Sequence, residues 1–349
     1  MNVRRRSRLP LGVALAVLLL PGGFTTAAAR PVAQVDENVV VQITSPQPGQ
    51  LLQGSVDITG FAADRRSSAG PGLNERDVAL YLNDSADQRN LFDYADTGED
   101  SPEAAAALGP QFAQAGFADS WETCSFPPGH YQLIVWVSSL VVPGARNFAS
   151  VDVEIAPCPA ATVIPNDAFE AHPDEASVRL AGPEGSGYMY GPIFADVAIG
   201  LDARCTQTGV DCRYGLEFRR LPGPANSPTD SAYAFWVNPA DGIFSLEYYP
   251  PGSDPDRGTF LIDDTPAPAI RSGTATNRLG VIAEGDWLRV FVNGQQVGEA
   301  HDSSRPWGMI SWLGATDDSG RAVEIQFGNL VIATPGPLDS LAPVLRGSS

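Results

Sequence analysis

The chain has 349 residues, a net charge of −19 and a pI near 4.4, and all 22 of its basic residues are Arg. This acidity excludes nucleic acid and an anionic membrane surface as partners, because both need a basic protein face. The 35 Gly and 30 Pro are spread along the chain, and helical periodicity is almost missing, which indicates an all-β protein of two domains.

The N-terminus has the pattern of a secretory signal peptide over residues 1–29. A basic segment precedes an apolar run, Leu9 to Leu20, and Ala27 to Ala29 offers small residues for cleavage after Ala29. The run is too short and interrupted for a membrane anchor. We therefore expect an extracellular, secreted protein whose mature chain has no membrane insertion, with a short leader at 30–38.

The first domain is predicted over residues 39–157. Five runs alternate or are apolar enough for strands, with Pro and Gly turns between them: 39–44, 52–61, 77–83, 131–138 and 148–155. Between them, Ser101 before Pro102 and an Ala run predicts a short helix that ends near Gly109. We expect this insertion to cover a sheet edge. The spacing is typical of an immunoglobulin-like (Ig-like) β-sandwich.

Three segments carry a resemblance in this first domain. They are the SPQPGQLLQGSVDITG opening, the PEAAAALGPQF…AGFADSW segment and the PPGHYQLIVWV strand. Together they resemble the Ig-like modules repeated on secreted and surface bacterial proteins. The resemblance implies a spacer or adhesion unit, and its motifs describe turns and core, not chemistry.

Four Cys in a secreted chain favour disulfides. Cys124 and Cys158 bracket the last two strands of the first half, and Cys205 and Cys212 flank a turn, so we expect the pairs 124–158 and 205–212. A Cys₄ zinc site would need close CxxC pairs, which are missing. The Pro-rich residues 158–161 form the predicted linker.

The second domain is predicted over residues 162–334, followed by a disordered tail at 335–349. A dozen short strands with no helix suggest two stacked antiparallel sheets. The strongest local signal is Asn293-Gly294 between two alternating runs, which predicts a two-residue hairpin turn.

The order YGLEFRR, YAFWVNPADGIFSLEYY, TNRLGVIAEGDWLRVFVNGQQVGEAHD, GMISW and VEIQFGNLVI carries a second resemblance. It is similar to the concanavalin A-like lectin/glucanase superfamily, and within it to laminin-G-like bacterial modules. The resemblance implies a jelly-roll sandwich. It does not select a ligand, because this fold holds lectins, glycosidases and spacers.

No catalytic motif is evident. The glucanases of this superfamily carry paired acids on one strand, whereas Glu217, Glu247, Glu284 and Glu324 each stand alone. None of the three His lies in a recognisable triad pattern, and no GxSxG motif occurs. The acidic turns at Asp254–Gly258 and Asp317–Gly320 leave a Ca²⁺ site open, and no other cofactor is indicated.

Aromatic residues in the second domain point to carbohydrate, whose apolar C–H faces pack on exposed rings. Alternation places Tyr233, Phe235 and Val237 in the core and Trp236 outside. It likewise places the aliphatic residues of 286–292 inside. The predicted ligand-binding residues are the ones left outside: Trp236, Trp287, Arg289 and Phe291.

These observations favour a secreted, non-catalytic protein that binds a glycan or a cell-envelope or matrix component through the second domain. A glycoside hydrolase or lyase with a divergent carboxylate site remains an alternative, as does a structural spacer without a ligand. The oligomeric state is left open.

Overall fold

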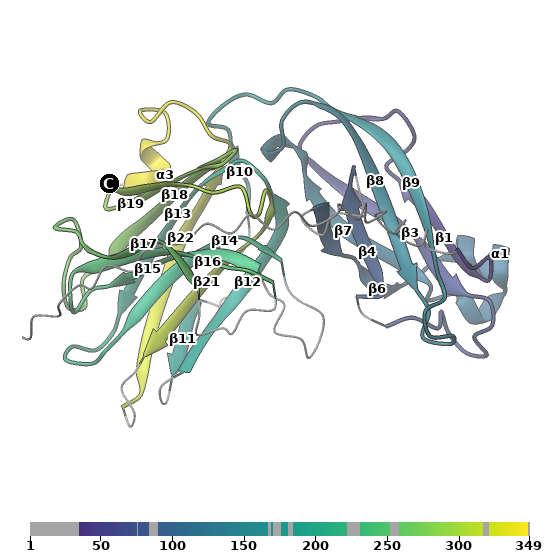
Figure 1. The fold of residues 1–349 in the computed structure, drawn as a ribbon, viewed down its shortest axis with the longest axis horizontal. Helices are drawn as coiled ribbons and strands as arrows, with labels where there is room; N and C mark the ends of the chain where they lie inside the picture. Colours follow the sequence, from purple (N-terminus) through teal and green to yellow (C-terminus); the bar gives the residue numbers. More distant parts are fainter. Residues whose placement is uncertain are drawn as a thin grey trace, which may run out of the picture. The chain divides into compact units, whose positions relative to one another are not determined.

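The computed structural model describes residues 35–74, 76–83, 90–166, 169, 176–180, 184–221, 231–251, 258–316 and 321–347. The predicted signal peptide lies outside these residues. Within them no helix has the length and apolar character to cross a bilayer. The fold is all-β, as predicted, and consists of β-sandwiches (Figure 1).

The strands β1 to β9 form the first sandwich. One of its sheets has the order β1-β3-β7, with β6 also on β7, and the other has the order β2-β9-β8-β4-β5. Their bounds are β1 Val39–Ser45, β2 Leu51–Leu52, β3 Ser55–Asp64, β4 Val78–Leu82, β5 Leu91–Tyr94, β6 Asp96–Glu99, β7 Gly116–Glu122, β8 Gly129–Ser138 and β9 Arg146–Ile155.

The core of the first sandwich is built around Trp121 of β7, which is fully buried. Its ring meets Phe92 edge-on at 5.4 Å between centroids and Phe126 at 5.5 Å. Sequence reasoning missed β5, β6 and β7, because their Asp, Gly and Ser residues break the apolar alternation. The two rings that anchor the core, Phe92 and Trp121, come from these missed strands.

The predicted helical insertion is confirmed as α1, Pro102–Leu108. The Ser101 hydroxyl accepts a hydrogen bond from the Ala104 amide at 3.1 Å, and Gly109 ends the helix at φ 121°. Ala104 packs with Phe61 on the outer face of β3, together with Phe112 of the 3₁₀ turn Pro110–Phe112. The insertion therefore covers a sheet face, not an edge as predicted, since β3 lies between β1 and β7.

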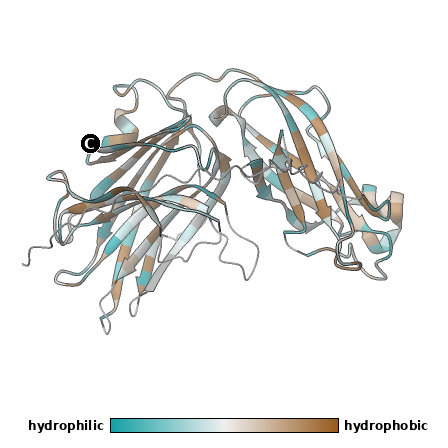
Figure 2. Ribbon diagram, in the orientation of Figure 1, coloured by the Kyte–Doolittle hydropathy of each residue, from teal (hydrophilic) through white to brown (hydrophobic). Residues whose placement is uncertain are grey.

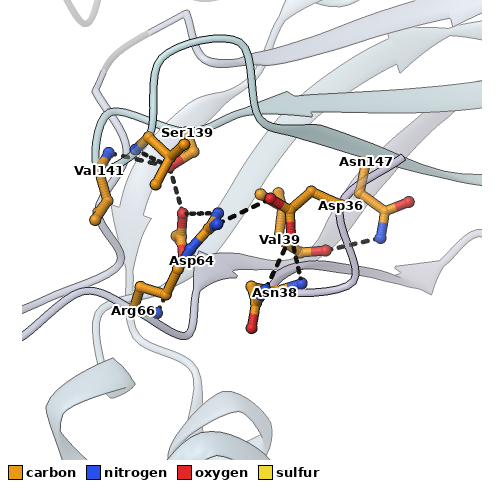
Figure 3. Close-up of polar contacts among 9 residues, drawn as sticks. Asp36, Asn38, Val39, Asp64, Arg66, Ser139, Val141 and Asn147 are labelled. Atoms are coloured by element: carbon orange, nitrogen blue, oxygen red, sulfur yellow. Dashed lines mark hydrogen bonds and ion pairs between the residues drawn. The ribbon is translucent and has the colours of Figure 1, made fainter. Parts of the chain in front are cut away.

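A polar cluster ties the end of β3 to the residues before β1 (Figure 3). The fully buried Asp64 carboxylate accepts hydrogen bonds from the Arg66 guanidinium (2.8 and 2.7 Å) and from the Ser139 hydroxyl. Arg66 also pairs with Asp36 at 2.8 Å. Arg66 lowers the pKa of Asp64 to about 2. The cluster therefore joins β3 to the residues before β1 and, through Ser139, to the loop after β8.

Two further sheets form the second sandwich. The sheet that carries Trp236, here called the Trp236 sheet, has the order β12-β21-β14-β15-β16-β17, and β12 also meets β7 at a single parallel bridge. Its strands are β12 Glu184–Phe194, β14 Arg213–Leu221, β15 Ser231–Asn238, β16 Ile243–Tyr249, β17 Thr259–Pro266 and β21 Gly308–Thr316.

The facing sheet, here called the Trp287 sheet, has the order β10-β22-β13-β18-β19-β20, with β11 paired to β22. Its strands are β10 Val163–Ile164, β11 Ser177–Leu180, β13 Val197–Cys205, β18 Asn277–Glu284, β19 Trp287–Val292, β20 Gln295–His301 and β22 Val323–Ala333. Hydrophobic and hydrophilic residues alternate along many of these strands (Figure 2), and the inward set forms one large core.

Several local predictions are confirmed. Asn293 (φ 51°) and Gly294 (φ 78°) form the turn between β19 and β20, because both positions need a positive φ. Both predicted disulfides are present, Cys124–Cys158 and Cys205–Cys212, with Cα–Cα distances of 5.4 and 6.4 Å.

The prediction of a disordered tail is wrong for residues 335–347. They include a short helix, α3 (Ala342–Arg346), which packs on β13 and β18 of the Trp287 sheet (Figure 1). Leu341, Val344 and Leu345 of this segment are at most 4% exposed and share a cluster with Phe291. The segment is polar overall, but it contains three apolar residues at helical spacing. Their burial holds the segment against the sheet.

Candidate functional site

Trp236 lies on the outward face of the Trp236 sheet. Tyr233, Phe235 and Val237 of β15 are buried in the core, as predicted, and the alternate residues point outward. In the ladder, Trp236 is opposite Gly215 on β14 and Ser245 on β16. The ring is partly exposed.

The indole ring rests over Gly215. A Cβ atom placed on Gly215 would lie 3.0 Å from Cε3 and 3.2 Å from Cδ2 of Trp236. Only the missing side chain lets the ring approach the backbone of β14 so closely. The glycine therefore lets the six-membered ring of the indole lie close to the backbone of β14.

A cavity of about 220 Å³ adjoins Trp236. Most of its other lining residues are polar: Asp211, Arg213, Asn238, Asp241, Ser245 and Asp264. Asn238 is 7% exposed, and its Nδ2 donates to Asp241 Oδ2 at 3.0 Å and to Asp211 Oδ1 at 3.5 Å. Hydrogen-bonding groups are thus held at fixed positions beside an aromatic ring.

Next to Trp236, two glutamates share the same outward face. In the ladder Glu217 of β14 and Glu247 of β16 lie on either side of Ala234. Strand spacing puts their Cα atoms roughly 10 Å apart. Sequence reasoning treated each glutamate as isolated. Their proximity could be predicted only from the strand register, which places both opposite Ala234.

Both carboxylates are engaged by neighbouring side chains. Glu217 is 8% exposed and forms an ion pair with Arg220. Glu247 accepts hydrogen bonds from Ser245 Oγ at 3.0 Å and from the Tyr249 hydroxyl at 2.8 Å. Burial and then the Glu247 carboxylate raise the pKa of Tyr249, while a hydrogen bond with Trp236 opposes the shift. We call the outward surface formed by Trp236, its cavity, Glu217, Glu247 and Tyr249 the Trp236 face.

The other three predicted residues lie on the opposite sheet. Trp287 is 45% exposed, and its ring stands 4.1 Å from that of His301. Arg289 pairs with Glu284 at 3.1 Å. Phe291 is 3% exposed beneath α3, so its ring is covered and cannot contact a ligand there. The four predicted residues do not form one site, and a ligand role for Trp287 and Arg289 stays a prediction.

Two buried carboxyls of the first sandwich, Asp93 and Asp119, have raised pKa values. Burial raises the pKa of both Asp93 and Asp119, and repulsion between them adds to the shift at Asp119. Asp93 is 3% exposed and sits opposite Leu80, whose side chain is in the core. Asp93 therefore lies inside the sandwich. Burial of the two carboxyls lowers the stability of the core and presents no surface to a ligand.

In the part of the chain that the structure describes, no group of three or more His, Cys, Asp or Glu side chains is placed to hold a metal ion. The turn acids Asp254, Asp256, Asp317 and Asp318, named above for Ca²⁺, lie outside it.

No protein-family model matches the chain, and no curated protein matches it. Solved structures with a similar fold include the CBM66 carbohydrate-binding module of Bacillus subtilis, at 17% identity and a TM-score of 0.36, over 45% of this chain and 86% of that one. A Bacillus licheniformis β-glucanase has 11% identity and a TM-score of 0.32, over 46% of this chain and 78% of that one. Sheep galectin-11 in complex with glycerol has 16% identity and a TM-score of 0.28, over 44% of this chain and 98% of that one. Similarities this low carry no argument about function.

Proposed function

We propose that this is a secreted, non-catalytic glycan-binding protein that holds its ligand on the Trp236 face. One observation carries the proposal: the indole of Trp236 lies over Gly215 at the wall of a cavity whose other residues are mostly polar. A sugar ring stacks its C–H face on an indole and directs its hydroxyls to neighbouring amides, carboxylates and guanidinium groups.

The arrangement of the acids favours binding over bond cleavage. Glycoside hydrolysis needs one carboxyl as an acid and a second one free to act as base or nucleophile. Glu217 is neutralised by Arg220, and Glu247 already accepts two hydrogen bonds from its own strand. In our proposal Glu247 orients Tyr249, which is hydrogen-bonded with Trp236, and both carboxylates accept hydrogen bonds from sugar hydroxyls.

The proposed type of each sandwich and the proposed secretion follow from the sequence patterns. The second sandwich is a concanavalin A-like, laminin-G-like module that makes the contact. The first sandwich is an Ig-like module, and the signal peptide sends the chain out of the cell. Two disulfides suit an oxidising, extracellular compartment.

The test begins with a panel of polysaccharides and oligosaccharides, against which the full mature chain is screened for retention. On the ligand found, Trp236→Ala should lower affinity about 30-fold, equivalent to roughly 2 kcal/mol for a central aromatic contact. Trp287→Ala is the matched control, because Trp287 is a more exposed indole on the opposite sheet.

Retention that survives Trp236→Ala in a folded protein would remove the proposed site. Release of reducing sugar from the bound glycan, lost in Glu217→Gln or Glu247→Gln, would instead establish the hydrolase.

A further inference from the structure

A second aromatic surface lies on the first sandwich, on the outward face of the sheet β2-β9-β8-β4-β5. Phe148 of β9 is 44% exposed, and its ring packs on Trp136 of β8 at 4.8 Å between centroids and 34° between planes. The guanidinium carbon of Arg146 lies 5.3 Å from the centre of the Trp136 ring. The exposed Phe148 ring thus packs against Trp136, and the Arg146 cation lies over the Trp136 ring.

The register extends this pair into a row. Trp136 is opposite Phe148 on one side and Ala79 on the other, and Ala79 is opposite Tyr94 on β5. Three aromatic rings therefore follow one line across four strands, a span of about 14 Å. Ala79, Tyr94 and Trp136 also pack against a buried cluster that includes Ile134 and Leu221, so the row is most open to solvent at Phe148.

Further along β8 and β9, the same face becomes polar. A cavity of about 450 Å³ is lined there by Asn83, His130, Gln132, Asp152 and Glu154, with Gly49, Tyr131 and Val153. His130 is opposite Glu154, and Gln132 is opposite Asp152, to which it donates a hydrogen bond at 3.1 Å. We call the aromatic row and this cavity together the Phe148 face.

We propose that the Phe148 face is a second glycan-binding face, so that one chain binds a long polysaccharide at two places. A row of rings beside amide, imidazole and carboxylate groups matches a ligand with apolar ring faces and hydroxyl edges. A second copy of this chain is a poor occupant, since its net charge of −19 would repel. The proposal relies on the proposed function only for the class of ligand.

If one chain has two binding faces, its affinity should depend on the length of the ligand. A short oligosaccharide occupies each face separately, whereas a long polymer that reaches both gains from the high effective concentration of the second contact. The wild-type chain should therefore bind two short oligosaccharides, and bind the long polymer at least tenfold more tightly than either face alone.

The test uses the full mature chain with Phe148→Ala, because removal of an exposed ring should leave the fold intact. Leu140→Ala is the control, since Leu140 is 50% exposed in the loop after β8 and is not part of the face. Calorimetry with a short oligosaccharide should give a stoichiometry of two for the wild type and Leu140→Ala, and one for Phe148→Ala. Affinity for the long polymer should fall about tenfold or more in Phe148→Ala alone.

A stoichiometry of one in the wild type, unchanged by Phe148→Ala, would overturn the second face. If Trp236→Ala then removes all binding, the proposed function stands without it. If neither variant affects binding, the Trp236 face is also wrong. A Phe148→Ala chain that keeps its stoichiometry of two also contradicts the proposal, because Phe148 would then contact no ligand.

Discussion

The two sheets of the second sandwich each present an outward tryptophan, in opposite surroundings. Trp236 lies over Gly215 at the wall of a polar cavity. Trp287 is more exposed, but His301 stands against its ring, Arg289 pairs with Glu284, and His301 Nδ1 lies 3.7 Å from an Asp286 oxygen. Exposure alone therefore does not make a binding platform; the residues on adjoining strands decide whether a ring has room and a polar cavity beside it.

A second difference is the C-terminal segment. Leu341, Val344 and Leu345 cover Phe291 on the Trp287 sheet. Arg278 of β18 fixes this segment, because its Nε donates to the Val344 carbonyl at 2.9 Å. The Trp287 sheet thus uses part of its outer surface for stability, whereas in this account the Trp236 sheet leaves its outer surface to a ligand.

The largest expected effect tests that covering role. Leu345 is 4% exposed and would contact a Cβ placed on Gly280 at 2.9 Å, so it fits closely on β18. Leu345→Ala should lower the free energy of unfolding by about 2–4 kcal/mol in urea titrations. Leu338→Ala, at an exposed position in the same tail, should change it by less than about 0.5 kcal/mol. Equal stability of the two variants would mean that α3 does not cover the sheet in solution.

An intermediate effect is expected from Gly215. In Gly215→Val the new side chain must displace the indole of Trp236, so glycan affinity should fall about tenfold, or 1.4 kcal/mol, although Trp236 is still present. Gly328→Val on β22 is the control, because a Cβ there meets nothing within 4 Å. Affinity that is unchanged in a folded Gly215→Val chain would show that the position of the ring on β14 does not matter.

The smallest effect concerns charge. The cavity beside Trp236 is lined by three Asp and one Arg and so carries excess negative charge. On the other sheet, the charges of Arg289 and Glu284 cancel each other. Binding of an anionic glycan should therefore improve in Asp264→Asn, by about 0.5 kcal/mol at an exposed position, and the gain should shrink at high salt. Glu284→Gln should leave it unchanged. An affinity for the anionic glycan that does not rise in Asp264→Asn at low salt would contradict a repulsive effect of this carboxylate.

Much of the fold could be predicted because its signals are local. Alternation in 233–237 and 287–292 assigned the inward residues correctly, Asn293-Gly294 marked its hairpin, and Ser101 to Gly109 marked a capped helix. Each signal depends on residues close together in the sequence. The strands β5 to β7 carry weaker patterns, since they contain polar residues both on the surface and, at Asp93, in the interior.

The candidate site was only partly predictable, because it depends on register. Trp236 was identified by its alternation, but Gly215 matters only as its cross-strand neighbour, and Glu217 and Glu247 share a face only through β15. Phe291 was misjudged for the same physical reason: a distant segment, α3, covers it. Contacts between segments far apart in the chain leave no local pattern.

The most direct test of the central claim is ¹⁹F NMR of the full mature chain labelled with 5-fluorotryptophan. The six Trp signals would be assigned through Trp236→Phe and Trp287→Phe. On titration with the glycan, the Trp236 signal should shift and saturate, while the Trp287 signal should stay in place. A saturable shift of Trp287 with Trp236 unmoved would contradict the assignment of the ligand to the Trp236 face.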